Sequence, residues 1–363
     1  MSRRIVLAPD SFKGTATAAE AADALARGWR SVAPDDEIVE LPMADGGEGT
    51  LDAFAVAVPG ARRVQVTVTG PDDRPVDAAW LRLPDGTAVV ELALASGITL
   101  LDPLRPLDAQ TLGFGEAIAA ALDAGATGLL LAIGGSSSTD GGTGALVALG
   151  ARFLDGDGRP IPRGGGGLAS LAVVDVSGLR TLPAEGARIL SDVTNPLLGP
   201  TGAAAVFAPQ KGATPDEVDL LEANLARLAR IVRGGDALAA APGAGAAGGT
   251  GFGLLAWGAR MAGGAGAVAD AIGLDAALAG ASLVVTGEGR FDGQSAAGKV
   301  PSEVTARAAA AGVPVGLVAG AITADASGFA ASVSLSALAG SGAAAMAEPL
   351  RWLEAAGAVL ARG

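Results

Sequence analysis

The alternation of apolar and polar residues predicts strands and helices in turn at the start of the chain. Residues 3–8 form a short apolar run, and a helix is expected from about 18 to 31. Thr17 precedes this helix and Glu20 lies in its first turn, and the two have the spacing of a capping box. A second strand is expected over 37–41, and it leads into a short apolar helix. This order favours a parallel sheet.

The middle of the chain has a different pattern. Three extended segments, 63–69, 76–83 and 88–92, are separated by turns rich in Gly, Pro and Asp, which is typical of an antiparallel meander. Further along we expect a helix over 111–124, a buried strand over 128–133 and a charged helix over 215–233. Two glycine-rich runs, 164–167 and 239–253, are interpreted as low-complexity linkers.

The final third returns to strand-loop-helix alternation, with strands expected at 282–286, 313–319 and 331–335. We therefore expect an α/β protein of two domains. A Rossmann-like parallel-sheet domain would be built from both chain ends, residues 1–65 and 280–363. An inserted α/β domain with mixed strands would comprise residues 66–279, with the active site in the cleft between the domains.

Composition restricts the chemistry. The 363 residues include no cysteine and no histidine, so a thiolate nucleophile, a Ser-His-Asp triad and a histidine-ligated metal are all excluded. A general base must then be Asp, Glu, Lys or water. The net charge of -13 argues against a nucleic-acid partner. Apolar runs too short for a membrane span, and an N-terminus without leader features, predict a cytoplasmic location.

Polar, glycine-rich loops follow the predicted strands, where open α/β sheets bind their ligands. In the first loop, Asp10, Ser11 and Lys13 offer a carboxylate, a hydroxyl and an amine to a phosphate or carboxylate and its metal. The alternative is a capped turn with Lys13 in solvent. In the second loop, Asp45, Gly46 and Glu48 combine carboxylates with an open backbone at a helix start. Such acids also suit a helix start without any ligand.

The third loop, residues 134–142, places hydroxyls between pairs of glycines. This pattern suggests a nest of donors for phosphate oxygens with a carboxylate available to a metal; its candidate residues are Ser136, Ser137, Ser138 and Asp140. The alternative is a flexible linker. A later polar loop contains Asp192 and Asn195, with Lys211 downstream. Asp192 and Asn195 would orient a substrate or merely form an Asx turn before the prolines.

A further loop, 286–299, mixes acids and bases as a site for phosphates and magnesium requires. Its candidate residues are Glu288, Arg290, Asp292, Gln294 and Lys299. Residues 293–299 have the spacing of a P-loop, but Val300 stands where the hydroxyl residue is needed, so we reject a P-loop. The alternative is a surface ion-pair loop. Taken together, the residues predict a phosphate-handling magnesium enzyme that relies on carboxylates.

The loops taken together resemble the glycerate kinase type 1 family of bacteria. The resemblance extends from Ala8 to about Ala319, and the matching segments are 8–14, 43–50, 192–200, 208–212, 244–253 and 286–299. Thr139 stands where the family commonly has Asn, and Ser295 to Ala297 replace a segment that often carries His. No departure removes a charged group.

The resemblance implies transfer of the ATP γ-phosphoryl group to D-glycerate with Mg2+, giving 2-phosphoglycerate in glycerate, glyoxylate and sugar-acid catabolism. It also implies two α/β domains around a cleft. We assign the phosphates and the substrate carboxylate to Lys13, Arg290 and Lys299. The loop 136–141 is assigned to the nucleotide phosphates. We assign the role of base to Asp45 or Asp192. The magnesium ligands are assigned to Glu288 and Asp292.

Other functions use the same residue types. The acceptor could be another short hydroxy acid, or the product 3-phosphoglycerate. A magnesium-dependent phosphohydrolase and a non-catalytic sugar-acid sensor are alternatives of other classes. The phosphohydrolase would need an Asp nucleophile motif or a His cluster, and the sensor an output domain. We expect small-molecule partners only, and the chain is compatible with a homodimer.

Overall fold

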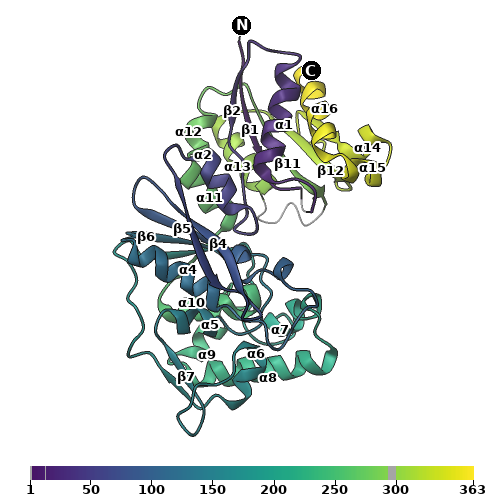
Figure 1. Ribbon diagram of the computed structural model, residues 1–363. Helices are drawn as coiled ribbons and strands as arrows, with labels where there is room; N and C mark the ends of the chain where they lie inside the picture. Colours follow the sequence, from purple (N-terminus) through teal and green to yellow (C-terminus); the bar gives the residue numbers. More distant parts are fainter. Residues whose placement is uncertain (1, 13, 293–299) are drawn as a thin grey trace. The chain divides into compact units, whose positions relative to one another are not determined.

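The computed structural model describes residues 2–12, 14–292 and 300–363 (Figure 1). The chain divides into two compact units. The first unit comprises Met1–Asp45, Asp52–Pro59 and Gly263–Gly363, and the second comprises Gly46–Leu51 and Gly60–Ala262. The boundaries expected near 65 and 280 both lie later in the chain than this division. The short segment Gly46–Leu51 belongs to the second unit.

The first unit contains a five-stranded sheet in which every neighbouring pair is parallel. Its order is β13-β12-β11-β1-β2. The strands are β1 (Arg4–Pro9), β2 (Glu37–Glu40), β11 (Leu283–Phe291), β12 (Val315–Ile322) and β13 (Ala331–Ser334). The first and the third strand in chain order, β1 and β11, are neighbours, so the winding of the sheet reverses between them. This position is the topological switch point of the unit, where α/β sheets bind ligands.

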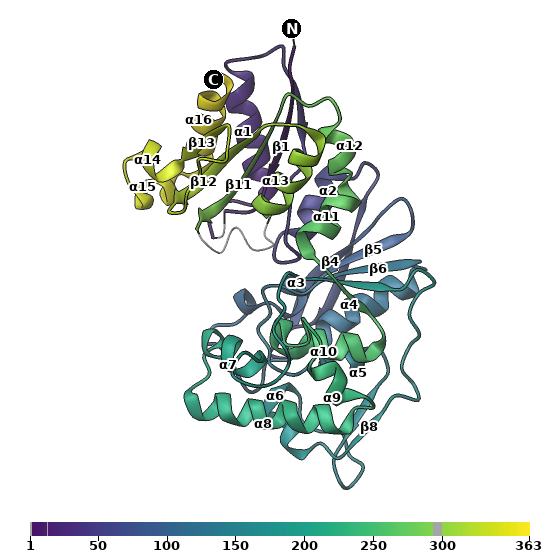
Figure 2. The ribbon, with the colours of Figure 1, turned by 180° about the vertical axis from the view of Figure 1, so that it is seen from behind.

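Helices cover both faces of this sheet (Figures 1 and 2). Their bounds are α1 (Ala18–Arg30), α2 (Thr50–Ala57, with Asp52 onward in this unit), α11 (Gly264–Ile272), α12 (Leu274–Leu278), α13 (Val300–Ala311), α14 (Leu335–Ala339), α15 (Gly342–Ala347) and α16 (Pro349–Ala361). The predicted capping box is confirmed, because Thr17 and Glu20 each bond the backbone of the other. Helices α1 and α16 share an apolar core with Leu7 and Val285 of the sheet. Helix α13 contacts β1 and β11.

Helices α1 and α16 meet backbone to backbone at two glycines. A Cβ added to Gly357 would lie 2.2 Å from the carbonyl oxygen of Leu25, and one added to Gly28 would lie 1.8 Å from that of Glu354. No side chain fits at either position. The contact therefore depends on the absence of a Cβ atom.

The second unit contains a six-stranded mixed sheet of order β10-β9-β6-β5-β4-β3. Its strands are β3 (Arg62–Thr69), β4 (Pro75–Arg82), β5 (Thr87–Glu91), β6 (Gly128–Ala132), β9 (Ala187–Leu190) and β10 (Arg260–Ala262). The predicted meander is confirmed, because β3, β4 and β5 pair antiparallel. From β5 to β10 the pairs are parallel, so four strands end at the same edge. A small antiparallel pair joins β7 (Arg152–Leu154) and β8 (Val173–Asp175).

The helices of this unit are α3 (Leu92–Ser96), α4 (Leu112–Asp123), α5 (Thr143–Ala148), α6 (Gly164–Gly167), α7 (Ala203–Phe207), α8 (Pro215–Ile231), α9 (Gly235–Ala239) and α10 (Ala246–Trp257). Short 3-10 turns lie at Ile98–Leu100, Leu168–Ser170 and Pro209–Lys211. Phe114 of α4 and Phe252 of α10 belong to one apolar core with Trp80 of β4. Among the described residues, no helix combines the length and the apolarity needed to cross a membrane.

The interpretation of residues 164–167 and 239–253 as linkers is wrong. The first run is helix α6, and the second begins at the last residue of α9 and contains most of α10. A Cβ at Gly165 would lie 2.4 Å from the carbonyl oxygen of Thr139, and one at Gly248 would lie 2.0 Å from that of Ser138. Both runs are rich in glycine because they pack directly against another backbone.

We predict that Gly357→Ala destabilises the first unit by about 1–3 kcal/mol, although alanine is the better helix former. The added methyl group must push α16 away from the Leu25 carbonyl. Gly342→Ala is the matched control, because its Cβ would meet only the Ser336 hydroxyl at 3.7 Å. Thermal unfolding of both variants checks this. A Gly357 variant as stable as the Gly342 variant would contradict the packing argument.

Candidate active site

Two buried carboxylates lie side by side at the switch point of the first unit. The amide of Asp10, directly after β1, donates to the carbonyl oxygen of Gly287 at 2.8 Å. Pro9 pairs with Gly287 in the ladder, so one further step of the same register brings Asp10 beside Glu288. Neighbours in a parallel ladder direct their side chains to the same face. Asp10 is 8% exposed and Glu288 is 7% exposed.

The expected loop after residue 286 is partly strand. Strand β11 continues to Phe291, so Glu288 and Arg290 are strand residues and extend the sheet beyond the end of β1. Gly287 makes this possible, because a Cβ there would lie 2.1 Å from the carbonyl oxygen of Val318. The Nε atom of Arg290 lies 3.6 Å from Asp292, and the Arg290 side chain is 68% exposed. Such an exposed pair contributes little to stability and leaves the cation accessible to an anion.

The second loop starts beside the first. The amide of Met43 donates to the carbonyl oxygen of Pro9 at 2.8 Å, so Asp45 follows at the same edge of the sheet as Asp10. Asp45 and Ser11 are half-buried, and the Ser11 amide donates to Asp10 Oδ1 at 2.6 Å. The first unit therefore brings together Asp10, Ser11, Asp45 and the polar residues of β11. The candidates Lys13, Gln294 and Lys299 lie outside the described residues.

The loop after β6 in the second unit is almost wholly buried. Its exposed part is confined to Gly134 and Gly135, whereas Ser136 is 7% exposed and residues 137–142 are buried. The Ser137 hydroxyl donates to the carbonyl oxygen of Ser96 at 2.8 Å. The Ser137 hydroxyl thus serves a contact within the unit, and the accessible surface of the loop lies at Gly134 and Gly135, which precede Ser136.

Asp140 holds this loop together. Its two oxygens accept hydrogen bonds from the amide and hydroxyl of Thr111 at 3.0 and 2.7 Å, and from the Ser138 hydroxyl at 3.2 Å. The amides of Gly142 and Gly144, at the start of α5, donate to it at 3.0 and 3.2 Å. The side chain is fully buried. With five donors around it, the carboxylate joins the starts of α4 and α5 to the loop.

Lys211 is buried against the same loop. Its amine donates to Ser136 Oγ at 2.7 Å and to the carbonyl oxygen of Ser138. Burial lowers the pKa of the Lys211 amine to about 7, and the negative charge of Asp140 opposes this shift. The amine and the carboxylate thus belong to one buried polar cluster, formed by Ser136, Ser138, Asp140, Lys211 and Thr111.

Glu91 is a residue that the sequence analysis missed. It ends β5, is 2% exposed, and accepts hydrogen bonds from the amides of Gly49 and Leu51 at 3.0 and 2.9 Å. The Gly134 amide donates to the carbonyl oxygen of Gly46 at 3.0 Å, so this segment also contacts the loop after β6. Glu48 is exposed on the resulting turn. The sequence signal that could have identified Glu91 is an acidic residue at the end of an apolar strand.

The remaining candidates of the second unit follow β9. Asp192 is half-buried. The Asn195 side chain donates to the carbonyl oxygen of Thr201 at 2.8 Å, and its own carbonyl accepts from the Gly245 amide at 2.9 Å. Asn195 therefore connects its loop to the glycine-rich start of α10.

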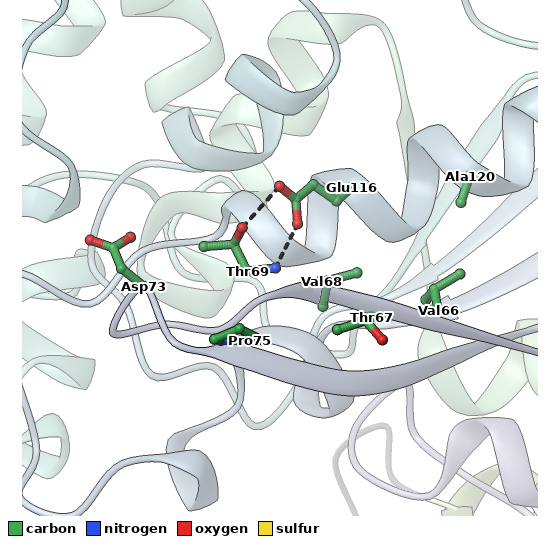
Figure 3. A pocket seen from close by; sticks show the side chains of 8 residues that line it. All are labelled: Val66, Thr67, Val68, Thr69, Asp73, Pro75, Glu116 and Ala120. Atoms are coloured by element: carbon green, nitrogen blue, oxygen red, sulfur yellow. Dashed lines mark hydrogen bonds between the residues drawn. The ribbon is translucent and has the colours of Figure 1, made fainter.

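A surface hollow in the second unit is lined neither by these loops nor by β11 (Figure 3). That hollow, of about 500 Å3, lies between the β3–β4 hairpin and α4. Glu116 occupies one wall, where both of its oxygens accept hydrogen bonds from Thr69 at 2.6 and 3.0 Å. Within the described ranges, no group of three or more Asp or Glu side chains has the arrangement of a metal site.

The depressed pKa of Lys211 predicts a pH-dependent stability difference. The unfolded chain keeps this amine protonated up to about pH 10, whereas the folded chain releases the proton near pH 7. The wild-type protein therefore gains up to roughly 4 kcal/mol of stability between these values, and Lys211→Met does not. When the free energy of unfolding of both proteins is measured from pH 6 to 10, the stability of the Met variant relative to wild type should fall as pH rises. A constant difference would contradict a depressed pKa.

Comparison with known proteins identifies the family. A sequence model of the glycerate kinase family matches residues 5–363. The chain is 46% identical over 332 residues to the glycerate kinase of Bacillus subtilis (strain 168), covering 89% of this chain and 86% of that protein. It is 43% identical over 331 residues to the glycerate 2-kinase of Escherichia coli (strain K12), with the same coverage.

A solved structure agrees with these relatives. The crystal structure described as that of a glycerate kinase 2 from Salmonella typhimurium LT2 matches with a TM-score of 0.86 and 40% identity, covering 100% of this chain and 98% of that one. The α/β fold class expected from the sequence is confirmed. The chain belongs to the glycerate kinase family and is therefore a kinase enzyme.

Proposed function

We propose that the chain catalyses ATP-dependent phosphorylation of D-glycerate to 2-phosphoglycerate in glycerate, glyoxylate and sugar-acid catabolism. The names of the Bacillus and Escherichia relatives support this substrate and, for the second, this position of transfer. The structural observation that carries the proposal is the pair of buried carboxylates, Asp10 and Glu288, at the switch point of a parallel sheet. A cytoplasmic location and an active site in a cleft between the domains stay predictions.

The donor set at this switch point suits Mg2+. Glu288 has Thr286 two residues before it on the same face of β11, and the Thr286 hydroxyl is fully buried without a hydrogen-bond partner among the described residues. Carboxylates and hydroxyls are oxygen ligands that magnesium accepts, usually one or two from the protein with the rest from phosphates and water. We propose that Glu288 and Asp10 hold the ion, with Asp292 further along the edge. Bound there, magnesium would neutralise charge on the transferring phosphates.

The protein's own groups would position the reactants. Arg290, exposed beside Asp292, would contact the phosphates or the substrate carboxylate, and the same roles for Lys13 and Lys299 stay predictions. The turn of residues 134–136 would offer the Gly135 and Ser136 amides and the Ser136 hydroxyl to nucleotide phosphates. Phosphoryl transfer through a loose transition state needs a base chiefly to orient the acceptor hydroxyl. Asp45 and Asp192, both half-buried, are the candidates for this role.

An ADP-release assay over a panel of short hydroxy acids tests the substrate. We expect D-glycerate to give the highest kcat/KM, at least about tenfold above tartronate and erythronate. Phosphorus NMR of the product then separates the 2-phosphate from the 3-phosphate. ATP hydrolysis without a phosphorylated acceptor would instead indicate a phosphohydrolase, and ligand binding without turnover a sensor.

Glu288→Gln tests the proposed metal ligand. The amide keeps the shape of the side chain and removes its charge, so we expect kcat to fall by about 100-fold or more while thermal stability changes little. Glu348→Gln is the control, because that residue is exposed and pairs only with Arg351 among the contacts described. A Glu288 variant with kcat within twofold of the control would remove Glu288 from the mechanism.

A further inference from the structure

Lys211 contacts the one accessible turn of its loop from the inside. The residue ends a short 3-10 turn, Pro209–Lys211, and is 2% exposed. Its amine donates to Ser136 Oγ at 2.7 Å and to the Ser138 carbonyl oxygen. Because Ser136 accepts from the amine, its own hydroxyl hydrogen is left to point elsewhere. The amine therefore orients Ser136 as a hydrogen-bond donor.

The space around this amine is closed. Gly248 has a φ of +65°, and a Cβ added there would lie 2.9 Å from Lys211 Nζ and 2.8 Å from the Cα of Thr139. The Gly248 carbonyl accepts from the Gly141 amide at 3.1 Å, which keeps this wall in place. The Lys211 side chain is thus buried behind the surface of the loop. Any influence of Lys211 on a ligand must pass through the residues that it holds.

The composition of the chain makes a lysine here notable. Of the 25 basic residues, 22 are arginines and three are lysines, at positions 13, 211 and 299. Arginine carries five N–H donors in a rigid fork and stays charged. The Lys211 amine has two acceptors and lies close against Gly248, which suits a compact amine.

The outer side of the turn is available to a ligand. Gly135 is exposed with a φ of +73°, and its carbonyl oxygen accepts from the Ile98 amide at 2.9 Å. The Ser137 amide donates to the Ser96 carbonyl oxygen at 3.1 Å. These contacts and Lys211 hold the turn at both ends. The Gly135 and Ser136 amides and the Ser136 hydroxyl are successive donors of this turn, and successive donors in a turn can bind phosphate oxygens.

We propose that Lys211 is a positioning residue for ATP, which it does not touch: its amine orients the Ser136 hydroxyl and fixes the 134–136 turn for a nucleotide phosphate. This proposal rests on the proposed kinase function and deepens it. Lys211 would then lie behind the residues that contact the ligand and would not be one of them. It also predicts that the effect of Lys211 is transmitted through Ser136.

A double-mutant cycle in calorimetric ATP binding tests this transmission. We expect Lys211→Met to weaken ATP binding about tenfold or more, corresponding to lost orientation of the turn. Ser136→Ala should weaken binding by a smaller factor. The double variant should match Lys211→Met, since the two residues act as one unit. Factors that multiply in the double variant would show that Lys211 does not act through Ser136 and would overturn the proposal.

A charge-matched control separates this effect from general loss of charge. Arg227→Met removes a cation of the same unit whose guanidinium donates to the Leu171 carbonyl oxygen at 3.3 Å, in a different part of the unit. We expect its ATP affinity to stay within about twofold of wild type. In turnover, Lys211→Met should raise KM for ATP and leave KM for glycerate nearly unchanged, a split that a purely structural role would not produce.

Lysine NMR tests the proposal even if the Met variant does not fold. Protein labelled with 13C in lysine has three side-chain signals, and Lys13→Arg and Lys299→Arg assign that of Lys211 by elimination. Saturating ATP should shift the Lys211 signal despite its burial. An unshifted signal would overturn the proposal.

Failure of the proposed function and failure of the proposed role of Lys211 give different results. Wild-type protein that binds ATP but phosphorylates no hydroxy acid refutes the proposed function alone. A Lys211→Met variant that binds ATP as tightly as wild type refutes the role of Lys211 alone. Wild-type protein that fails to bind ATP refutes both.

Discussion

The second unit depends on one buried carboxylate. Asp140 has no contact with solvent, so its charge is tolerated only because five donors surround it. Those donors come from the start of α4, the start of α5 and the loop that joins β6 to α5. Satisfying one charge therefore fixes where three segments meet. Lys211 adds a second polar group to the same cluster, and the glycines of α6 and α10 let neighbouring backbones close around it.

The first unit obtains its site from the order of its strands. Parallel strands β1 and β11 are far apart in the chain and adjacent in the sheet, with the winding reversing between them. Asp10 follows β1, Glu288 lies in the part of β11 that extends beyond β1, and the loop after β2 starts beside β1 at Met43. Phosphoryl transfer asks a protein mainly for positioning and for charge neutralisation. A rigid sheet edge with two adjacent carboxylates meets the first of these needs directly.

Much of the local structure was predictable from short-range patterns. The capping box of Thr17 and Glu20 and the meander of β3 to β5 were confirmed, because both signals lie within a few residues of each other. The linker interpretation of residues 239–253 failed, since glycine marks close backbone approach as well as flexibility. Glu91 was overlooked because its partners, Gly49 and Leu51, are about forty residues away.

The sequence by itself determined the chemical inventory: no histidine, no cysteine, and acids and bases gathered in ordered loops that resemble one family. It also predicted most of the strands and the helices α1, α4 and α8, because hydrophobic periodicity is a local property. Only the tertiary structure decided that Asp10 lies beside Glu288, that Asp140 supports its loop, and that Lys211 is enclosed behind Ser136. Burial and adjacency arise from packing between distant segments, and that information is absent from any short stretch of the chain.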